Sequence, residues 1–225
     1  MNCIHEFCKM EILLVAATKF EIQPTLDWLQ NNKNNLSNHH INTLITGVGI
    51  ADCTYYLTTH LIHKKVDMVL QAGIAGTFNY NINLSETVLV KQDAFGDVGM
   101  EEKGNFKTIF DAGFADKNAP PFTEGWLINK TKFNEHSTLK QVKGITVNKV
   151  SDSSFQRQQL QQYFAPDIET MEGAAFHFVC MHQQIPFLQI RTISNVVGER
   201  DKSKWTIEEA IINLNIELQK IITEL

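Results

Sequence analysis

The chain has 225 residues, of which 43% are hydrophobic, and its 20 Lys and Arg against 25 Asp and Glu give a formal net charge of −5. This length suits a single α/β domain, residues 1–225, with a sizeable core. Nucleic acid and anionic membranes are excluded as main partners, because both attract a basic surface. No apolar run approaches the roughly 20 residues that span a bilayer.

The N-terminal residues 1–9 are too short and too polar for a secretory signal, so we expect a flexible extension there. The four cysteines, Cys3, Cys8, Cys53 and Cys180, have neither the spacing of a disulfide framework nor that of a zinc site. We therefore expect free thiols in a cytoplasmic protein that holds no metal.

Short runs rich in Val, Ile and Leu alternate with helical patterns in chain order. Strands buried on both faces are expected at residues 11–17, 42–48, 67–73 and 186–194. Strands with one wetter face are expected at residues 86–92 and 142–150, and helices at 20–30, 51–64, 171–184 and 206–225. The last helix carries an apolar stripe at i+3/i+4 spacing.

This alternation predicts an α/β fold, a three-layer α/β/α sandwich around a mixed, mostly parallel sheet. Residues 95–135 are irregular, with frequent Gly, Pro and Asn. Ligands bind at the carboxyl ends of the strands in such sheets, so the residues that follow each strand are the candidates for a site.

Two glycine pairs follow predicted strands, Gly47 with Gly49 and Gly73 with Gly76. Glycine in such a turn lets the backbone approach a ligand closely. The dinucleotide fingerprint is not satisfied, because Asp52 stands at its third glycine position. Tight strand-to-helix turns explain these glycines equally well.

Glu21 lies just after the first predicted strand. A carboxylate in the first turn of a helix is favoured by the helix dipole, which gives Glu21 a structural explanation. Its functional explanation is a general base that deprotonates a water molecule.

Met171 and Glu172 open an apolar helix. A carboxylate that enters a buried helix start requires a partner, and the two hydroxyls of a ribose would provide one. The alternative is an acid that caps its own helix.

Asn195 ends the strand at 186–194, where it could terminate the strand or contact the edge of a heterocycle.

Five motifs occur in an order that resembles the purine nucleoside phosphorylase/hydrolase superfamily. Within it, the chain is similar to the branch of methylthioadenosine/S-adenosylhomocysteine nucleosidases and futalosine hydrolases. The motifs are Val15-Ala-Ala-Thr-Lys-Phe-Glu21, Ile45-Thr-Gly-Val-Gly49, Gln71-Ala-Gly-Ile-Ala-Gly76, Glu169-Thr-Met-Glu-Gly173 and Arg191-Thr-Ile-Ser-Asn195.

The resemblance implies roles for the catalytic candidates. Glu21 matches the water-activating carboxylate, and Glu172 matches the residue that holds the 2′ and 3′ hydroxyls of the ribose. Asn195 stands where the adenine-specific enzymes carry an Asp that protonates N7 of the departing base. The residues expected to line the substrate are Gly49, Ala75, Gly76, Val150, Met171 and Trp205.

The Asn at position 195 favours a 6-oxopurine as the leaving base. Breaking the glycosidic bond places negative charge on the purine, which catalysis must stabilise. An Asn has no proton to release, but its amide can donate to O6 of hypoxanthine. The glycine turns carry no Arg or Lys to hold phosphate, so water is the expected nucleophile.

The resemblance therefore implies hydrolysis of a purine nucleoside, with futalosine as the expected substrate and hypoxanthine as the released base. A methylthioadenosine/S-adenosylhomocysteine nucleosidase and a non-catalytic nucleoside-binding protein remain as alternatives. No cofactor is expected. The resemblance also suggests a homodimer or a higher homo-oligomer.

Overall fold

The computed structural model describes residues 9–32, 39–132 and 137–225. Residues 1–8 of the predicted extension, with Cys3 and Cys8, lie outside the described part. The central sheet follows the order β10-β4-β8-β9-β3-β1-β2, with β7 beside β4. Its strands are β1 (Met10–Ala16), β2 (His39–Ile45), β3 (Met68–Thr77), β4 (Thr87–Phe95), β7 (Leu127–Ile128), β8 (Lys140–Thr146), β9 (Ile168–Thr170) and β10 (Phe187–Val196).

One part of this sheet closes on itself. Strand β10 pairs with β4 and also with β3, so that β10, β4, β8, β9 and β3 form a ring. The pairs β1–β2, β1–β3, β10–β3, β4–β8 and β8–β9 are parallel, whereas β10–β4, β3–β9 and β4–β7 are antiparallel. The expectation of a mixed, mostly parallel sheet is confirmed.

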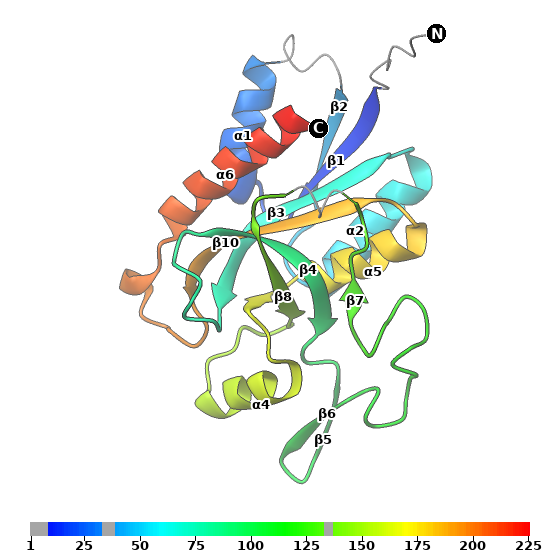
Figure 1. Cartoon of the computed structure of the whole chain (residues 1–225), viewed down its shortest axis with the longest axis vertical. Coiled ribbons are helices and arrows are strands. Elements are labelled where there is room, and N and C mark those ends of the chain that lie inside the picture. The colour runs from blue at the N-terminus through cyan, green and yellow to red at the C-terminus, as the bar shows by residue number, and fades with distance from the viewer. Residues whose placement is uncertain (1–8, 33–38, 133–136) are drawn as a thin grey trace.

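Helices cover both faces of the sheet (Figure 1). Helices α1 (Lys19–Asn31) and α6 (Ile207–Glu224) lie together on one face, and α2 (Ile50–His63) and α5 (Gly173–Gln183) on the other. Successive side chains of β1 point to opposite faces of the sheet. Leu14 packs toward α1 and α6, whereas Leu13 packs toward α2 and α5. A third cluster of Val, Ile and Ala side chains fills the ring.

One expectation about the elements is wrong, and some elements were not predicted. Strand β2 was expected to be buried on both faces, but His40, Asn42, Thr43 and other side chains of this strand are exposed or half-buried. It lies at the edge of the sheet, so only one neighbour covers it. Helix α4 (Ser154–Phe164) and the short strand β9 were not expected, nor was the hairpin of β5 (Gly99–Glu102) and β6 (Asn105–Thr108) within the irregular region.

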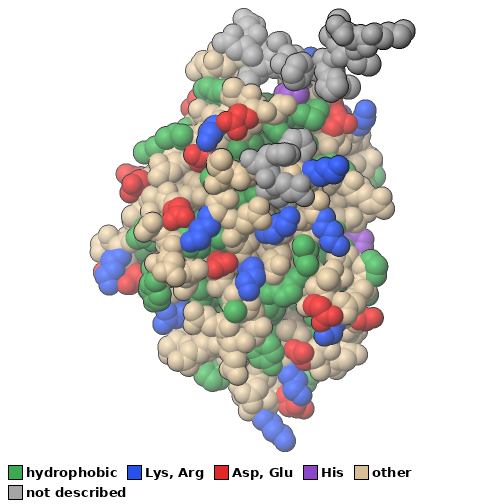
Figure 2. All heavy atoms as spheres, viewed as in Figure 1, with side chains coloured by type: hydrophobic (Ala, Val, Ile, Leu, Met, Phe, Trp, Pro, Cys, Tyr) green, Lys and Arg blue, Asp and Glu red, His purple; other side chains and the backbone are tan. Residues whose placement is uncertain are grey.

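In the part of the chain that the structure describes, none of the helices has the length and apolar character that a membrane crossing requires. Basic and acidic side chains are interspersed over the face shown in Figure 2.

Candidate active site

A cleft of about 390 Å³ opens at the carboxyl ends of β1, β3 and β10. Its lining comes from separate segments of the chain: Ala17, Thr18, Phe20, Glu21, Val48, Ile74, Ala75, Gly76, Val150, Glu169, Thr170, Met171, Glu172, Ser194, Asn195, Trp205 and Ile207. The candidates Glu21, Glu172 and Asn195 therefore share one cleft, where the rule for parallel strands expects a site.

Glu21 enters the cleft from the first turn of α1. Its Oε2 accepts hydrogen bonds from the Thr18 backbone N–H at 3.0 Å and from the Thr18 hydroxyl at 2.9 Å. Its Oε1 accepts from the Ile74 N–H at 3.1 Å. Glu21 therefore does cap its helix, yet Oε1 accepts only one of these hydrogen bonds, so acceptor capacity remains for a ligand in the cleft.

Glu172 is 4% exposed and immediately precedes α5. Its side chain does not cap that helix. Instead, Oε1 accepts from the Gly49 N–H at 2.9 Å, and Oε2 lies 3.6 Å from Nη1 of Arg191. Burial raises the pKa of the Glu172 carboxyl, and the charge of Arg191 and the Gly49 hydrogen bond oppose that rise.

Arg191 is a site residue to which the sequence analysis gave no role. It lies in β10 and is 1% exposed, beneath the cleft. Gly73 makes room for it, since a Cβ there would lie 2.4 Å from Nη1 of Arg191 and 2.9 Å from Oε1 of Glu21. The available signal was a charged residue inside an otherwise uncharged, buried strand, which requires a charged partner.

Asn195 lies next to a bulge in the pairing of β10 with β3, which leaves it beside Gly76. Its Oδ1 accepts from the Ser194 hydroxyl at 2.9 Å, and its Nδ2 donates to the Val196 carbonyl at 3.0 Å. These contacts fix the amide at the cleft wall. A Cβ on Gly76 would lie 3.3 Å from Nδ2, so the glycine keeps the space in front of the amide open.

The remaining candidates also surround the cleft. Ala75, Gly76, Val150, Met171 and Trp205 line it, and Val150 is 40% exposed at its mouth. The Trp205 ring is tethered, because Nε1 donates to the Glu199 carbonyl at 2.9 Å. Gly49 does not line the cleft, and it acts through its N–H on Glu172.

A buried polar network holds the start of α5 behind Glu172. The Ala174 N–H donates to the Thr146 hydroxyl at 2.6 Å, and that hydroxyl donates to Oδ1 of Asp93 at 3.0 Å. Gln189 Nε2 donates to Oδ2 of Asp93 at 3.3 Å. Burial raises the pKa of Asp93 to about 7, opposed by Thr146 and by the charge of Arg191. Gly173 permits this packing, since a Cβ there would lie 2.2 Å from Oδ2 of Asp93.

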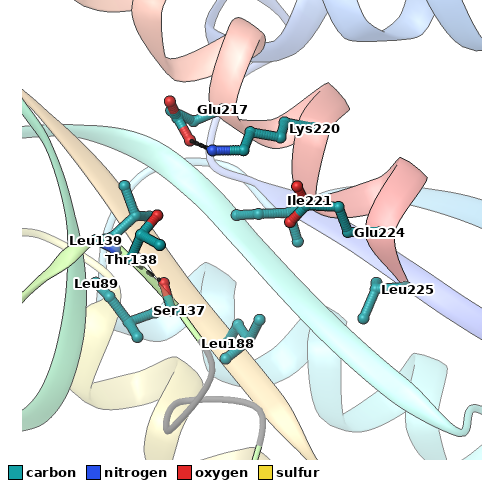
Figure 3. Close-up of a pocket in the computed structure, with 10 residues that line it drawn as sticks. All are labelled: Leu89, Ser137, Thr138, Leu139, Leu188, Glu217, Lys220, Ile221, Glu224 and Leu225. Atoms are coloured by element: carbon teal, nitrogen blue, oxygen red, sulfur yellow. Dashed lines mark hydrogen bonds and ion pairs between the residues drawn. The ribbon is translucent and has the colours of Figure 1, made fainter.

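A second hollow, of about 180 Å³, lies between α6 and residues 137–139 (Figure 3). Leucine and isoleucine side chains dominate its wall, and the pair Glu217–Lys220 spans 3.9 Å at its edge. It contains none of the catalytic candidates, so the cleft described above is the candidate active site.

In the described part of the chain, no group of three or more His, Cys, Asp or Glu side chains is arranged to hold a metal ion. Cys53 of α2 and Cys180 of α5 are buried free thiols.

Comparison with known proteins identifies the family of the chain. A family model of the phosphorylase superfamily matches residues 33–225. The futalosine hydrolase of Thermus thermophilus is 27% identical over 191 residues, covering 80% of this chain and 80% of the relative. A 5′-methylthioadenosine/S-adenosylhomocysteine nucleosidase of Bacillus thuringiensis is 22% identical over an alignment that covers 96% of this chain and all of the relative.

Among solved structures, the native futalosine hydrolase of Helicobacter pylori aligns with a TM-score of 0.76 at 18% identity, covering 96% of this chain and 98% of that one. At this identity the likeness concerns the fold, and it confirms the expected nucleoside phosphorylase-like sandwich. The family model covers most of the chain, so this protein belongs to the phosphorylase superfamily.

Proposed function

We propose that this chain hydrolyses the N-glycosidic bond of futalosine, releasing hypoxanthine and dehypoxanthinyl futalosine. One observation carries the proposal: two buried glutamates and an Asn amide meet in a single cleft of a phosphorylase-superfamily fold. The futalosine hydrolase relatives, at 27% and 26% identity, support futalosine as the substrate over the 22% nucleosidase relative.

Glu172 is the proposed anchor of the ribose. Its carboxylate can accept hydrogen bonds from both sugar hydroxyls, and the charge of Arg191 opposes the rise in its pKa that burial causes. The same negative charge stabilises the positive charge that develops on the ribose as the glycosidic bond breaks.

Glu21 is the proposed base. A water molecule held by its carboxylate attacks the anomeric carbon and gives its proton to Glu21. The bond between that carbon and the purine nitrogen breaks, and its electron pair leaves with the base. Thr18 and Ile74 hold the carboxylate in place, so no reorientation is needed during the reaction.

Asn195 is proposed to stabilise the departing base. Its Nδ2 can donate to O6 of hypoxanthine, where negative charge accumulates, and this hydrogen bond strengthens as the glycosidic bond breaks. The proton that finally neutralises the purine comes from solvent, since Asn has none to give.

Water is the proposed nucleophile, although the family is named for phosphorylases. The residues that line the cleft, all in the described part of the chain, include Glu21, Glu169 and Glu172 but no Lys or Arg. Arg191 lies beneath the lining and already faces Glu172. A phosphate dianion would meet negative charge without the cationic groups that usually bind it.

The test is release of free base. Purified protein in phosphate-free buffer should release hypoxanthine from futalosine, with no dependence on added phosphate. Adenine release from methylthioadenosine, without hypoxanthine release from futalosine, would instead identify a nucleosidase. Calorimetric binding of nucleosides without turnover would identify a binding protein.

A homodimer in the cytoplasm, acting in menaquinone biosynthesis, completes the proposal. Helix α2 exposes Tyr55, Tyr56 and Ile62, and Val48 is exposed beside its start. Exposed apolar side chains gathered in this way favour a protein interface. Light scattering should give twice the 25.6 kDa mass of one chain, and a single-chain mass would contradict the dimer.

A further inference from the structure

Asn215 is a buried polar residue of α6 to which the mechanism above gives no role. It is 2% exposed, and its side-chain amide makes four hydrogen bonds. Its Oδ1 accepts from the Thr25 N–H at 3.0 Å and from the Thr25 hydroxyl at 2.7 Å. Its Nδ2 donates to the carbonyl of Glu21 at 2.8 Å and to that of Ile211 at 2.7 Å. The amide thereby uses its full capacity of two donor hydrogens and two acceptor lone pairs.

Three of these bonds reach α1, which lies beside α6 (Figure 1), around the residue that carries the proposed base. In a regular α-helix the N–H of Thr25 faces the carbonyl of Glu21, four residues earlier. The amide of Asn215 contacts both of these groups, so it bridges one step of the α1 hydrogen-bond ladder. The backbone of Glu21 is therefore held by α6.

Pro24 gives the first turns of α1 a need for this support. A proline inside a helix has no N–H to donate to the carbonyl four residues earlier, which here belongs to Phe20. The proline ring also crowds that carbonyl, and helices bend at such positions. The bridge from Asn215, which begins at the residue after Pro24, fixes the backbone where α1 would otherwise be free to bend.

Different elements hold the backbone and the carboxylate of Glu21. The carboxylate accepts from the Ile74 N–H of β3 and from Thr18 at the start of α1. The carbonyl accepts from Asn215 of α6. A change in the course of α1 would therefore move the carboxylate relative to β3 and the cleft. A misplacement of about 1 Å at a reacting group lowers the rate by about 10²-fold.

We propose that Asn215 is a positioning residue for the hydrolysis: its amide holds the Glu21 carbonyl and the Thr25 N–H, and so places the Glu21 carboxylate where it takes the proton of the attacking water. This inference rests on the proposed function, because it requires Glu21 to act as the base. Asn215 does not line the cleft, so it acts through Glu21 and not on the substrate. Its loss should lower kcat and leave KM nearly unchanged.

The experiment is a double-mutant cycle of Asn215→Leu and Glu21→Gln, with kcat for hypoxanthine release from futalosine as the measurement. Asn215→Leu removes all four hydrogen bonds of the amide, and we expect it to lower kcat by about 10²-fold when Glu21 is present. In the Glu21→Gln background no base remains to be positioned, so the same change should have little further effect. An equal loss of kcat in both backgrounds would overturn the inference, because it would leave Asn215 with a purely structural role.

Leu218→Ala is the control that separates positioning from general destabilisation. Leu218 lies one turn further along α6, fully buried in the core cluster that α1 and α6 share, and it makes no hydrogen bond to α1 through its side chain. Its replacement should destabilise the fold but leave kcat, corrected for the folded fraction by circular dichroism, at the wild-type value. A corrected kcat that fell as far as in Asn215→Leu would also overturn the inference.

Thr25→Val keeps the proposal testable should Asn215→Leu fail to fold. The new side chain has nearly the same shape, and only the hydroxyl bond to Oδ1 of Asn215 is lost. We expect kcat to fall by about 5-fold, the factor that one neutral hydrogen bond represents. The change should have no effect in the Glu21→Gln background. An unchanged kcat with Glu21 present, or the same loss in both backgrounds, would contradict the positioning role.

The two levels of the proposal fail in different ways. If the wild type releases hypoxanthine from futalosine but the changes are independent in the cycle, the role of Asn215 is wrong and the proposed function stands. If the wild type releases adenine from methylthioadenosine instead, futalosine is the wrong substrate, and the same cycle on that nucleoside decides the role of Asn215. If the wild type cleaves neither nucleoside, both proposals fail together.

Discussion

Arg191 and Glu172 face each other beneath the cleft, with 3.6 Å between Nη1 and Oε2 and with side chains that are 2% and 5% exposed. The arrangement exists because Gly73 leaves the space that the guanidinium occupies. A buried carboxylate is strongly destabilising without an opposite charge. The pair therefore links the stability of the fold to the ionisation of the proposed ribose anchor.

Replacing Arg191 with Met should test this link. Arg191→Met leaves Glu172 buried and unpaired, and we expect the free energy of unfolding to fall by about 3–5 kcal/mol at pH 8. The loss should be smaller at pH 5, because the raised pKa of Glu172 then allows it to be protonated and neutral. Urea unfolding at the two pH values measures both effects.

Arg157→Met provides the matched control, since Arg157 donates from Nη1 to the Val197 carbonyl at 3.0 Å instead of facing a buried carboxylate. Its destabilisation should not change between pH 5 and pH 8. Equal destabilisation of Arg191→Met at both pH values would contradict an ionised, charge-paired Glu172.

Glu21→Gln separates the two roles of Glu21. The amide oxygen can still accept from Thr18, but the amide group loses the acceptor that faces the Ile74 N–H, so we expect about 1 kcal/mol of destabilisation. The rate of hypoxanthine release should fall by 10²–10⁴-fold, on the order expected for loss of a positioned base.

Asp27→Asn is the control on the same helix, where the carboxylate accepts from Gln23 on the exposed face. Its rate should match the wild type. A Glu21→Gln enzyme that retained most of its rate would leave Glu21 with a capping role alone.

The sequence was sufficient for the candidates that follow strands. Glu21 and Asn195 sit at strand ends, and strand ends meet at one edge of a parallel sheet, so their convergence could be predicted before any contact was known. Their partners could not be predicted in this way. Nothing in the spacing of the chain indicates that Arg191 reaches Glu172 through the space left by Gly73.

The missed elements have equally physical reasons. Strand β9 has only three residues, Ile168–Thr170, which is too short to show an alternating pattern, yet it carries Glu169. Helix α4 buries only Leu160 fully, so its apolar stripe is weak. The exposure of β2 depends on its place at the sheet edge, which is a property of topology and not of local sequence.

Asp93 should give stability a distinctive dependence on pH. Its pKa is about 7 in the fold, against 3.8 ordinarily, so the unfolded chain loses this proton first as pH rises. The contribution of Asp93 to stability therefore decreases between about pH 4 and pH 7. Asp93→Asn removes this dependence, and the Gln189 amide can turn so that its free Oε1 accepts from the new amide.

We expect the free energy of unfolding of Asp93→Asn, relative to wild type, to rise by about 2–3 kcal/mol from pH 5 to pH 7. Asp201→Asn serves as the control, because hydrogen bonds from Ser203 lower the pKa of that exposed carboxylate and no change is expected in this range. A relative stability of Asp93→Asn that stayed constant with pH would mean that Asp93 is ionised throughout.

Asn195→Asp should move the preference of the enzyme from hypoxanthine toward adenine as the leaving base. The new carboxyl would face the Val196 carbonyl, which now accepts from Nδ2 at 3.0 Å. An ionised oxygen in that position would be repelled, so the protonated form is favoured. A protonated Asp can give its proton to N7 of the departing base, which Asn cannot do.

For Asn195→Asp, chromatography of the free bases should show the ratio of adenine to hypoxanthine release rise by about 10²-fold. This is the discrimination between the two bases that is lost when one positioned hydrogen bond no longer favours the 6-oxopurine. Asn213→Asp, where the amide donates to the Ser85 carbonyl away from the cleft, should leave the ratio unchanged. A ratio equal to that of the wild type in Asn195→Asp would show that the residue at position 195 does not contact the base.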